Sequence, residues 1–482
     1  MSRPPFCLTA DELARWTGGR WIVPPGSRTH GGGFAIDTRT MTQGQVFVAL
    51  KGEKIDGHAF ARDALAKGGA WCVIASSESS LGPGAVEWAR NLGAGVLLVR
   101  DTAAALLGLA RARRGSIAPA KVVAVCGSNG KTTTTRLVRA AVARGDDCVA
   151  SIKSFNNALG VPLTILNAPA AFGTLVCEVG SNAPGEIDPL GEVVRPDVAV
   201  ITSIGREHLE GFGSLEGVLR EETSILRWVA PGGVAVVNAD SPGLIDAARA
   251  WAAGRGDEVR VLAFGVSPGA TLRITSIEAD LAGVRFRLDG RAYRAPLLGA
   301  HNAWNAAAAV AVGLALGRTP ELIADQLASA RGPEMRMEPV TVGGVTFIND
   351  AYNANPDSML AAIAAVRALA PAGSPRVFVL GDMLELGAAS ASSHAEVLAE
   401  ARRDPSDRVV LIGPSFAAAA GTPDERTLVI PEASPEGCAR AAAFEPGSFV
   451  LLKGSRRTAV ERVLASYRAR INAGGVACST CS

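Results

Sequence analysis

One stretch in the first third of the chain constrains its fold more than any other. Residues 121–135 read KVVAVCGSNGKTTTT, in which the apolar run Val122–Val125 leads into a glycine-rich turn. The run is typical of a buried parallel strand, and the apolar spacing after the turn favours a helix. Strand, glycine turn and helix in this order predict an α/β fold that points backbone N–H groups and a positive helix end at one place.

The turn carries the residue types that bind nucleotide phosphates. Its small residues leave the backbone open to a ligand: Gly127, Ser128, Asn129 and Gly130. Lys131 adds a mobile positive charge for the outer phosphates, and the Thr132 hydroxyl is placed to ligate Mg²⁺, with Thr133 next to it. The general phosphate-loop pattern has a further glycine where Val125 stands, so a plain strand-to-helix turn is the alternative.

Composition limits the class of protein. A chain of 482 residues predicts about three domains. Hydrophobic residues make up 48% and charged residues 20%, which predicts large cores rather than disorder. The net charge of +2 is too small to indicate attraction to nucleic acid or a membrane. The longest apolar stretch, 306–316, is too short to cross a bilayer, and no signal-peptide pattern opens the chain, so we expect a cytoplasmic protein.

Cysteine and lysine usage add two smaller constraints. The eight cysteines are scattered, mostly in apolar segments where a reduced, packed thiol is usual. Cys478 and Cys481 form a Cys-x-x-Cys with no second pair nearby, which favours a frayed tail over a zinc or redox site. Only seven of the 48 basic residues are lysine, so each lysine is a candidate for a specific role.

The succession of apolar runs and helical patterns predicts three α/β domains, at 1–115, 116–330 and 331–482. The first has short strands at 47–50, 70–74 and 95–99. The second has strands at 174–177, 198–201, 234–237 and 259–262 behind the glycine-rich turn, which predicts a doubly wound parallel sheet, and an antiparallel meander at 271–297. The third repeats the parallel pattern at 376–380, 408–412 and 448–452.

Polar residues follow two strands of the central domain. Glu178 follows one, and Glu207 and His208 follow the next, so we expect all of them on the same rim as Lys131. A carboxylate in this position suits Mg²⁺, which needs oxygen ligands to share with ATP. A lone histidine is more often structural, so His208 alone does not establish a metal site.

Several of these segments resemble the ATP-dependent Mur ligases and their folylpolyglutamate synthase relatives. They are GSNGKTT at 127–133, KSFNNALGVP at 153–162, CEVGSNAPGE at 177–186 and IGREHLEGFG at 204–213. The segments IDTRT at 36–40, FVALKGEKIDGH at 47–58, YNANP at 352–356 and GDMLELG at 381–387 are similar to the branch that adds D-alanyl-D-alanine. The resemblance implies a small N-terminal α/β UDP-binding domain, a central P-loop ATPase-like domain and a C-terminal Rossmann-like domain.

The resemblance implies an amide ligase of peptidoglycan precursor synthesis. ATP would phosphorylate the terminal carboxylate of a UDP-N-acetylmuramoyl-tripeptide, and the amine of D-alanyl-D-alanine would attack the acyl phosphate. ADP and phosphate would leave, with ATP and Mg²⁺ as cofactors. We expect a monomer that acts without nucleic acid or membrane insertion. Two alternatives stay open: a sister ligase that adds a different amino acid, and a non-enzymatic ATP-binding regulator on the same scaffold.

The resemblance also assigns residues. It implies that Lys131, Glu178 and His208 are catalytic, with Thr132, Glu178 and His208 holding magnesium. Besides the loop, the implied ATP contacts are Asn302, Asn305, Arg336 and Asp350. The implied substrate contacts are Thr38, Arg39, Lys51, Asn156, Asn157, Tyr352, Asn353 and Lys453. The plainer alternatives are solvated turns for the first-domain residues, helix caps for Asn302 and Asn305, and a surface lysine for Lys453.

The chain departs from this family at one position that matters. Mur ligases typically carry a carbamylated lysine on the helix after the histidine loop, where its carboxylate holds magnesium. Here the helix at 215–228 contains no lysine, and Glu222 occupies the matching place. We expect Glu222 to supply the missing oxygens directly, as a catalytic and metal-binding residue. The alternative is that Glu221 and Glu222 form a solvated helix face.

Overall fold

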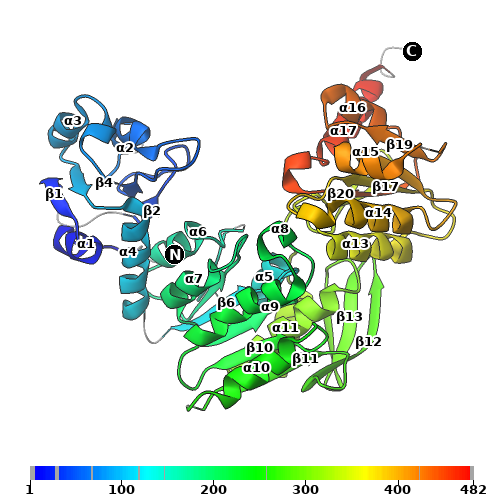
Figure 1. The fold of residues 1–482 in the computed structure, drawn as a ribbon, viewed down its shortest axis with the longest axis horizontal. Helices are drawn as coiled ribbons and strands as arrows, with labels where there is room; N and C mark the ends of the chain where they lie inside the picture. The colour runs from blue at the N-terminus through cyan, green and yellow to red at the C-terminus, as the bar shows by residue number, and fades with distance from the viewer. Residues whose placement is uncertain are drawn as a thin grey trace.

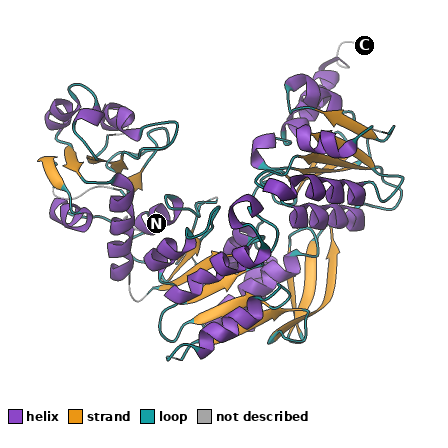
Figure 2. Ribbon diagram, in the orientation of Figure 1, coloured by secondary structure: helices purple, strands orange, loops and turns teal. Residues whose placement is uncertain are grey.

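The computed structural model describes residues 6–27, 32–66, 69–117, 120–145, 147–152, 154–256, 258–422 and 424–477. These residues form three sheets that follow one another along the chain, with the first and third on either side of the central one (Figure 1). Helices pack on the faces of the sheets (Figure 2), which confirms the predicted three-domain α/β fold. The boundaries near residues 115 and 330 stay a prediction.

The first sheet has five strands in the order β1-β5-β4-β3-β2. Its strands are β1 (Arg20–Val23), β2 (Phe34–Ala35), β3 (Val46–Val48), β4 (Cys72–Ala75) and β5 (Gly95–Leu98). Only β1, at the edge, is antiparallel to its neighbour. The helices here are α1 (Ala10–Thr17), η1 (Gly57–Phe60), α2 (Ala61–Ala66), η2 (Ser79–Leu81), α3 (Ala85–Leu92) and α4 (Thr102–Ser116).

The central sheet has nine strands in the order β14-β13-β12-β11-β10-β9-β6-β8-β7. Its strands are β6 (Lys121–Cys126), β7 (Cys148–Ala150), β8 (Thr174–Glu178), β9 (Val198–Ile201), β10 (Val234–Asn238), β11 (Arg260–Gly265), β12 (Leu272–Asp280), β13 (Gly283–Leu288) and β14 (Arg291–Ala295). The first six are parallel; five of them were predicted, and β7 was not. The predicted meander is β12–β14, but it extends the central sheet, because β12 begins parallel to the end of β11.

Helices cover both faces of the central sheet. They are α5 (Lys131–Val142), α6 (Gly160–Leu166), α7 (Ile187–Val194), α8 (Leu209–Phe212), α9 (Leu215–Thr223), η3 (Ser224–Trp228), α10 (Leu244–Ala253), α11 (Asn302–Ala315) and α12 (Pro320–Ala328). In β6, Val122 and Ala124 belong to one hydrophobic cluster, and Val123 and Val125 to another. Burial on both faces explains why this strand is an unbroken apolar run in the sequence.

The third sheet has six strands in the order β15-β16-β20-β17-β18-β19. Its strands are β15 (Glu338–Val342), β16 (Val345–Asp350), β17 (Arg376–Gly381), β18 (Arg408–Ile412), β19 (Thr427–Ile430) and β20 (Phe449–Lys453). Only β15 is antiparallel. The helices are α13 (Pro356–Leu369), η4 (Gly387–Ala389), α14 (Ser390–Ala401), α15 (Pro414–Ala420), α16 (Pro435–Ala441), η5 (Arg456–Thr458) and α17 (Arg462–Ala477).

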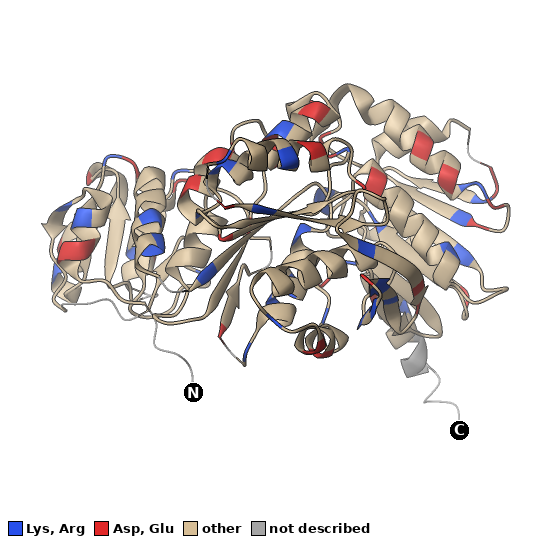
Figure 3. Cartoon of the chain, turned by 90° about the horizontal axis from the view of Figure 1, so that it is seen from below, with Lys and Arg blue, Asp and Glu red and all other residues tan. Residues whose placement is uncertain are grey.

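The first two sheets share one hydrophobic core, whereas the third has its own. Helix α4 runs from the first sheet to β6, and its Leu106 and Leu109 are buried in a cluster that contains both Phe34 of the first domain and Val122 of the second. The two clusters that flank the third sheet draw almost all of their residues from that domain. Acidic and basic residues are interspersed along the chain (Figure 3). Within the described ranges, none of the helices has both the length and the apolar character needed to cross a membrane.

Candidate active site

The glycine-rich loop connects the carboxyl end of β6 to the start of α5. Gly127 has φ +117° and Gly130 has φ +86°, backbone conformations that residues other than glycine rarely adopt. A Cβ at Gly127 would lie 2.3 Å from Thr202 Oγ1, and one at Gly130 would lie 2.2 Å from Asn305 Oδ1. The segment that follows β9 also holds the loop backbone, since Asn129 N donates to Ser203 Oγ at 2.9 Å. Two glycines are therefore required where the backbone approaches its neighbours this closely.

Lys131 lies among carboxylates at the start of α5. Its Nζ donates to Gly127 O at 2.5 Å and to Glu207 Oε2 at 3.2 Å. Burial lowers the pKa of Lys131, but the carboxylates of Glu207, Glu222 and Glu178 outweigh burial and raise it overall. The ammonium group is therefore held in its charged form beside the loop, where a phosphate would need it.

Glu178 ends β8 beside Thr132, as predicted. Its side chain is buried, and its Oε1 accepts hydrogen bonds from Thr132 Oγ1 at 3.1 Å and Asn156 Nδ2 at 2.9 Å. Its Oε2 is buried and has no hydrogen-bond partner among the described residues. Burial raises the pKa of Glu178. A buried carboxylate oxygen without a partner, next to a threonine hydroxyl, fits a divalent cation that is also bound by substrate phosphates.

His208 follows β9 and faces the third domain. Its backbone has φ +46°, and its Nδ1 contacts Glu385 Oε2 across the domain junction. Burial lowers the pKa of His208. Within the described residues, no three His, Cys, Asp or Glu side chains are grouped so that they could hold a metal ion. The structure therefore does not assemble the predicted set of Glu178, His208 and Glu222.

Glu222 supports the loop from behind. Its carboxylate is 2% exposed, and Oε2 accepts the N–H of Gly127 at 2.7 Å. Glu221 is buried too and accepts the N–H groups of Gly185 and Ile187. The solvated-face alternative is therefore wrong for both residues. Glu222 lines neither cavity beside the loop, so the structure gives no support to a direct contact with magnesium.

Glu207 is a site residue that the sequence placed on the rim but did not single out. It is 5% exposed, and its carboxylate pairs with Lys131 at 3.2 Å. Burial raises the pKa of Glu207, and Lys131 partly offsets that rise. Its position directly before His208 was the available signal.

Two cavities meet at the loop. The first measures about 200 Å³ and the second about 440 Å³, and Asn129, Gly130 and Arg336 line both. The first also contains most of the predicted catalytic and substrate residues: Ser128, Lys131, Thr132, Asn156, Asn157, Glu178, His208, Tyr352, Asn353 and Lys453. The second contains the other predicted ATP contacts: Thr133, Asn302, Asn305 and Asp350. Gly127 lines neither.

Several of these side chains are already engaged. Arg336 Nη2 donates to Thr132 Oγ1 at 3.1 Å, and its guanidinium lies 4.4 Å from the centre of the Tyr352 ring. Lys453 is buried, so the alternative of a surface lysine is wrong. Its Nζ pairs with Asp350 Oδ2 at 2.6 Å. Asn157 Oδ1 accepts the N–H groups of residues 159 and 160 at the start of α6.

The two predicted ATP asparagines on α11 are joined to each other and to the loop helix. Asn305 Nδ2 donates to Asn302 Oδ1 at 2.8 Å, and Thr134 Oγ1 donates to Asn305 Oδ1 at 3.2 Å. Neither side chain accepts a hydrogen bond from the first N–H groups of α11, so the helix-cap alternative is not supported.

Three predicted substrate residues lie apart from this group. Thr38 and Arg39 follow β2, and Lys51 follows β3, both in the first sheet. None of the three lines either cavity. Arg39 is exposed, and its hydrogen bonds to Asp37 lower the pKa of that carboxyl to about 2. Lys51 is exposed as well. Lys153, in one of the family-like segments, and the Cys478–Cys481 pair lie outside the described residues.

Comparison with known families decides what this scaffold is. The model of the Mur ligase middle domain matches residues 125–313. The model of the Mur ligase glutamate ligase domain matches residues 335–456, and that of the Mur ligase family catalytic domain matches 32–114. The chain belongs to the Mur ligase family. As a Mur ligase it has all three family domains, in the order that the sequence predicted.

Individual relatives of this Mur ligase agree. It is 35% identical over 413 residues to the UDP-N-acetylmuramoyl-tripeptide–D-alanyl-D-alanine ligase of Bacillus subtilis, covering 84% of this chain and 85% of the relative. The enzyme of the same name from Escherichia coli is 33% identical over 442 residues, with 89% and 92% covered. A crystal structure of MurF from Acinetobacter baumannii has a TM-score of 0.84 at 31% identity and covers 97% of this chain and 100% of its own.

Proposed function

We propose that this Mur ligase uses ATP to join D-alanyl-D-alanine to a UDP-N-acetylmuramoyl-tripeptide. The names of the Bacillus subtilis and Escherichia coli relatives support this acceptor and this amine. The observation that carries the proposal is the convergence of Lys131, Thr132 and Glu178 beside a cavity at the carboxyl ends of β6 and β8. On this proposal the protein acts in the cytoplasm, as a monomer, in peptidoglycan precursor synthesis.

ATP would occupy both cavities. The larger one, with Asn302, Asn305 and Asp350, has the size and polar lining for a nucleoside, while the loop N–H groups face the phosphates. The structure of MurF from Thermotoga maritima, 26% identical to this chain, is described as a complex with ADP, which supports nucleotide binding in this fold. Lys131 would exchange its contact with Gly127 O for the outer phosphates.

Magnesium would be held by Thr132 and Glu178. When bound, it would neutralise charge on the transferring phosphoryl group. We keep His208 as a candidate ligand, which would have to leave Glu385. We assign Glu222 to the loop instead, because its carboxylate faces the Gly127 amide.

The chain's own residues would then handle the substrates. A free carboxylate is a poor electrophile, and its phosphorylation creates an acyl phosphate that an amine can attack. Lys131 and Arg336 place positive charge beside the cavity where the phosphoryl group moves. Tyr352, Asn353 and Lys453 bring the third domain to the same cavity, so its closure would exclude water from the acyl phosphate. Thr38, Arg39 and Lys51 remain candidates for the UDP-sugar, provided that Arg39 leaves Asp37.

An ADP-release assay tests the proposal. The purified chain is given ATP, Mg²⁺ and UDP-N-acetylmuramoyl-tripeptide, with and without D-alanyl-D-alanine. We expect release that depends on the dipeptide, and a loss of about 10²–10³-fold in Lys131→Ala. Release with another amine in a panel of amino acids would identify a sister ligase instead. Release with none of them would favour a non-enzymatic ATP-binding regulator.

A further inference from the structure

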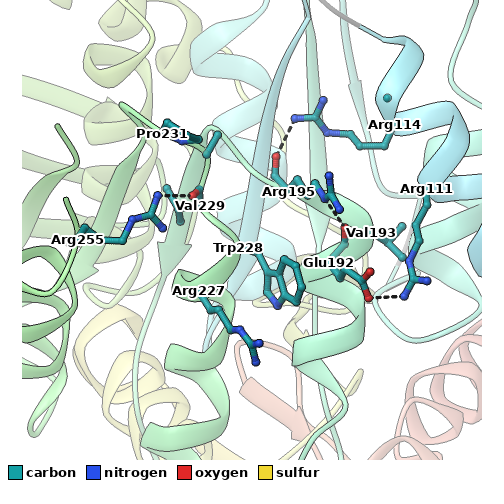
Figure 4. Close-up of a pocket in the computed structure, with 12 residues that line it drawn as sticks. Arg111, Arg114, Glu192, Val193, Arg195, Arg227, Trp228, Val229, Pro231 and Arg255 are labelled. Atoms are coloured by element: carbon teal, nitrogen blue, oxygen red, sulfur yellow. Dashed lines mark hydrogen bonds and ion pairs between the residues drawn. The ribbon is translucent and has the colours of Figure 1, made fainter. Parts of the chain in front are cut away.

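Another cavity lies at the amino ends of the central strands, on the side of the sheet opposite to the glycine-rich loop. It measures about 510 Å³ and is lined by the ends of α4, α7 and η3 and by the turn into β10 (Figure 4). Residues 229–231 precede β10, so this edge carries the amino ends of the strands, whereas the loop follows the carboxyl end of β6. The cavity shares no lining residue with the two cavities of the candidate active site.

Arginine dominates this cavity. Its five arginines come from segments far apart in the sequence: Arg111, Arg114, Arg195, Arg227 and Arg255. Among the residues that line it, the acidic one is Glu192. The carboxylates of Glu192, Asp197 and Asp188 pair with three of these arginines and compensate part of the positive charge. A bound anion would compensate the rest and lower the electrostatic energy of the group.

Three of the guanidinium groups are fixed in place by protein contacts. Arg114 donates to the carbonyls of residues 194 and 195, both at 2.7 Å, and so caps the end of α7. Arg111 pairs with Glu192, and Arg255 Nη2 donates to Val229 O at 3.2 Å. These contacts preorganise part of the cavity without a ligand.

The other two arginines keep donors available. Arg195 uses only Nε, which donates to Glu192 O at 3.2 Å, and its terminal nitrogens have no partner in the part of the chain that the structure describes. Arg227 is 71% exposed and lies 3.5 Å from Asp188 as a loose ion pair. Figure 4 shows the Trp228 ring between Arg195 and Arg227, and a 2.8 Å hydrogen bond from Nε1 to Asp188 holds the ring in place.

We propose that this arginine pocket binds a small anion that carries at least two phosphate groups. Guanidinium groups bind phosphate oxygens through paired hydrogen bonds, and Arg195 and Arg227 have such pairs to offer. The volume lies within the usual range for small-molecule sites, about 300–1,000 Å³. Five arginines around a hollow of this size match a compact polyphosphate better than a flat macromolecular surface.

Equilibrium binding of inorganic pyrophosphate to the full chain tests the proposal. We expect two sites in the wild type, one at the glycine-rich loop and one in the arginine pocket. Lys131→Ala should remove the first and leave the second. The double variant Arg195→Ala/Arg227→Ala should weaken the second at least tenfold and leave the first. The matched control is Arg285→Ala/Arg291→Ala, which removes two exposed arginines of the meander and should leave both sites intact.

Two results would overturn the assignment. One is unchanged pyrophosphate binding in Arg195→Ala/Arg227→Ala, with melting temperatures showing that the variant is folded. The other is citrate binding to the pocket as tightly as pyrophosphate, which would make it a general anion site. A wild type that lacks the Lys131-dependent pyrophosphate site but keeps the other would count against the proposed function and not against the arginine pocket.

Discussion

At the scale of single residues, the loop is surrounded by three buried carboxylates that share one lysine. Glu178, Glu207 and Glu222 are each at most 5% exposed, and each raises the pKa of Lys131. Among the described residues, Glu178 Oε2 and Glu207 Oε1 are buried without a hydrogen-bond partner, whereas Glu222 Oε2 accepts the N–H of Gly127. Glu222 therefore shapes the loop, and Glu178, whose other oxygen contacts the Thr132 hydroxyl, is the carboxylate that we assign to a cation.

Replacing Glu222 tests this division. Glu222→Ala leaves the buried Gly127 N–H without an acceptor, so we expect a loss of about 1–3 kcal/mol in the free energy of unfolding and weaker ADP binding. Glu222→Gln retains an acceptor oxygen and should recover most of both. Denaturant unfolding and ADP titration without Mg²⁺ measure the two effects. A variant that only raised the Mg²⁺ requirement would instead support a direct metal role.

The sequence identified the chemistry of this site but not its internal pairing. Lys131, Thr132 and Glu178 could be predicted because the strand-end rule places them on one rim. The contact of Glu222 with Gly127 spans 95 residues of sequence, and that of Lys131 with Glu207 spans 76. No local pattern encodes such contacts, because they depend on how α9 and the segment after β9 pack against the loop.

At the scale of elements, the loop and α11 fit together without room for a side chain. Gly130→Ala should displace the loop, because its Cβ would overlap Asn305 Oδ1 and its φ of +86° is unfavourable for alanine. We expect a loss of about 1–3 kcal/mol in the free energy of unfolding and a large loss of ADP affinity.

Gly232→Ala is the matched control for Gly130→Ala. The backbone at Gly232 has a similar φ of +70°, but a Cβ added there would have no atom of the described residues within 4 Å. We expect it to lose some stability and keep full ADP affinity. Equal ADP affinity in the two variants would show that the contact with Asn305 is not what shapes the loop.

The turn after β10 predicts a pH dependence. Burial raises the pKa of Asp240, but hydrogen bonds from Trp304 and the amides of Val266 and Ser267 outweigh burial and lower it below 3.8. The folded state therefore gains stability from Asp240 above that pH and loses it as the pH falls. Asp240→Asn should be less stable than wild type at pH 7, with the difference shrinking in acid. Urea unfolding across pH, with the exposed Asp325→Asn as control, measures this.

Elements were easier to predict where burial is uniform. Strands such as β6 and β18 are buried between helices on both faces, so each appears in the sequence as an unbroken apolar run. The strands that were missed are β1, β2, β7, β15, β16 and β19. In β15 the exposed and half-buried residues alternate, and β16 ends in the polar residues Asn349 and Asp350, so neither strand is an unbroken apolar run.

At the scale of the whole molecule, the third domain meets the central one through polar contacts. Arg206 pairs with Asp357 at 2.7 Å and with Glu396 at 2.6 Å, and Asn355 Nδ2 donates to Asn129 Oδ1 at 2.9 Å. Arg206→Ala should change the free energy of unfolding by less than about 1 kcal/mol per lost pair. It should also shift the population toward an open form with a larger radius of gyration.

Small-angle scattering over a range of salt concentrations checks this expectation. Screening acts on the same ion pairs, so the wild type at high salt should approach the variant. Arg285→Ala, which breaks ion pairs within the meander alone, is the control. A radius of gyration that neither salt nor the Arg206 variant changes would mean that these pairs do not hold the domains together.

The shared core around α4 gives the chain one place where it can be divided and one where it cannot. Cutting near residue 331 crosses a junction held mainly by ion pairs and amide contacts, so a fragment ending there should fold and could be mixed with its missing partner to restore activity. Cutting near residue 117 would separate α4 from Val122 and its neighbours and expose a hydrophobic surface to water. Split versions of this ligase should therefore be recoverable at the first position and precipitate at the second.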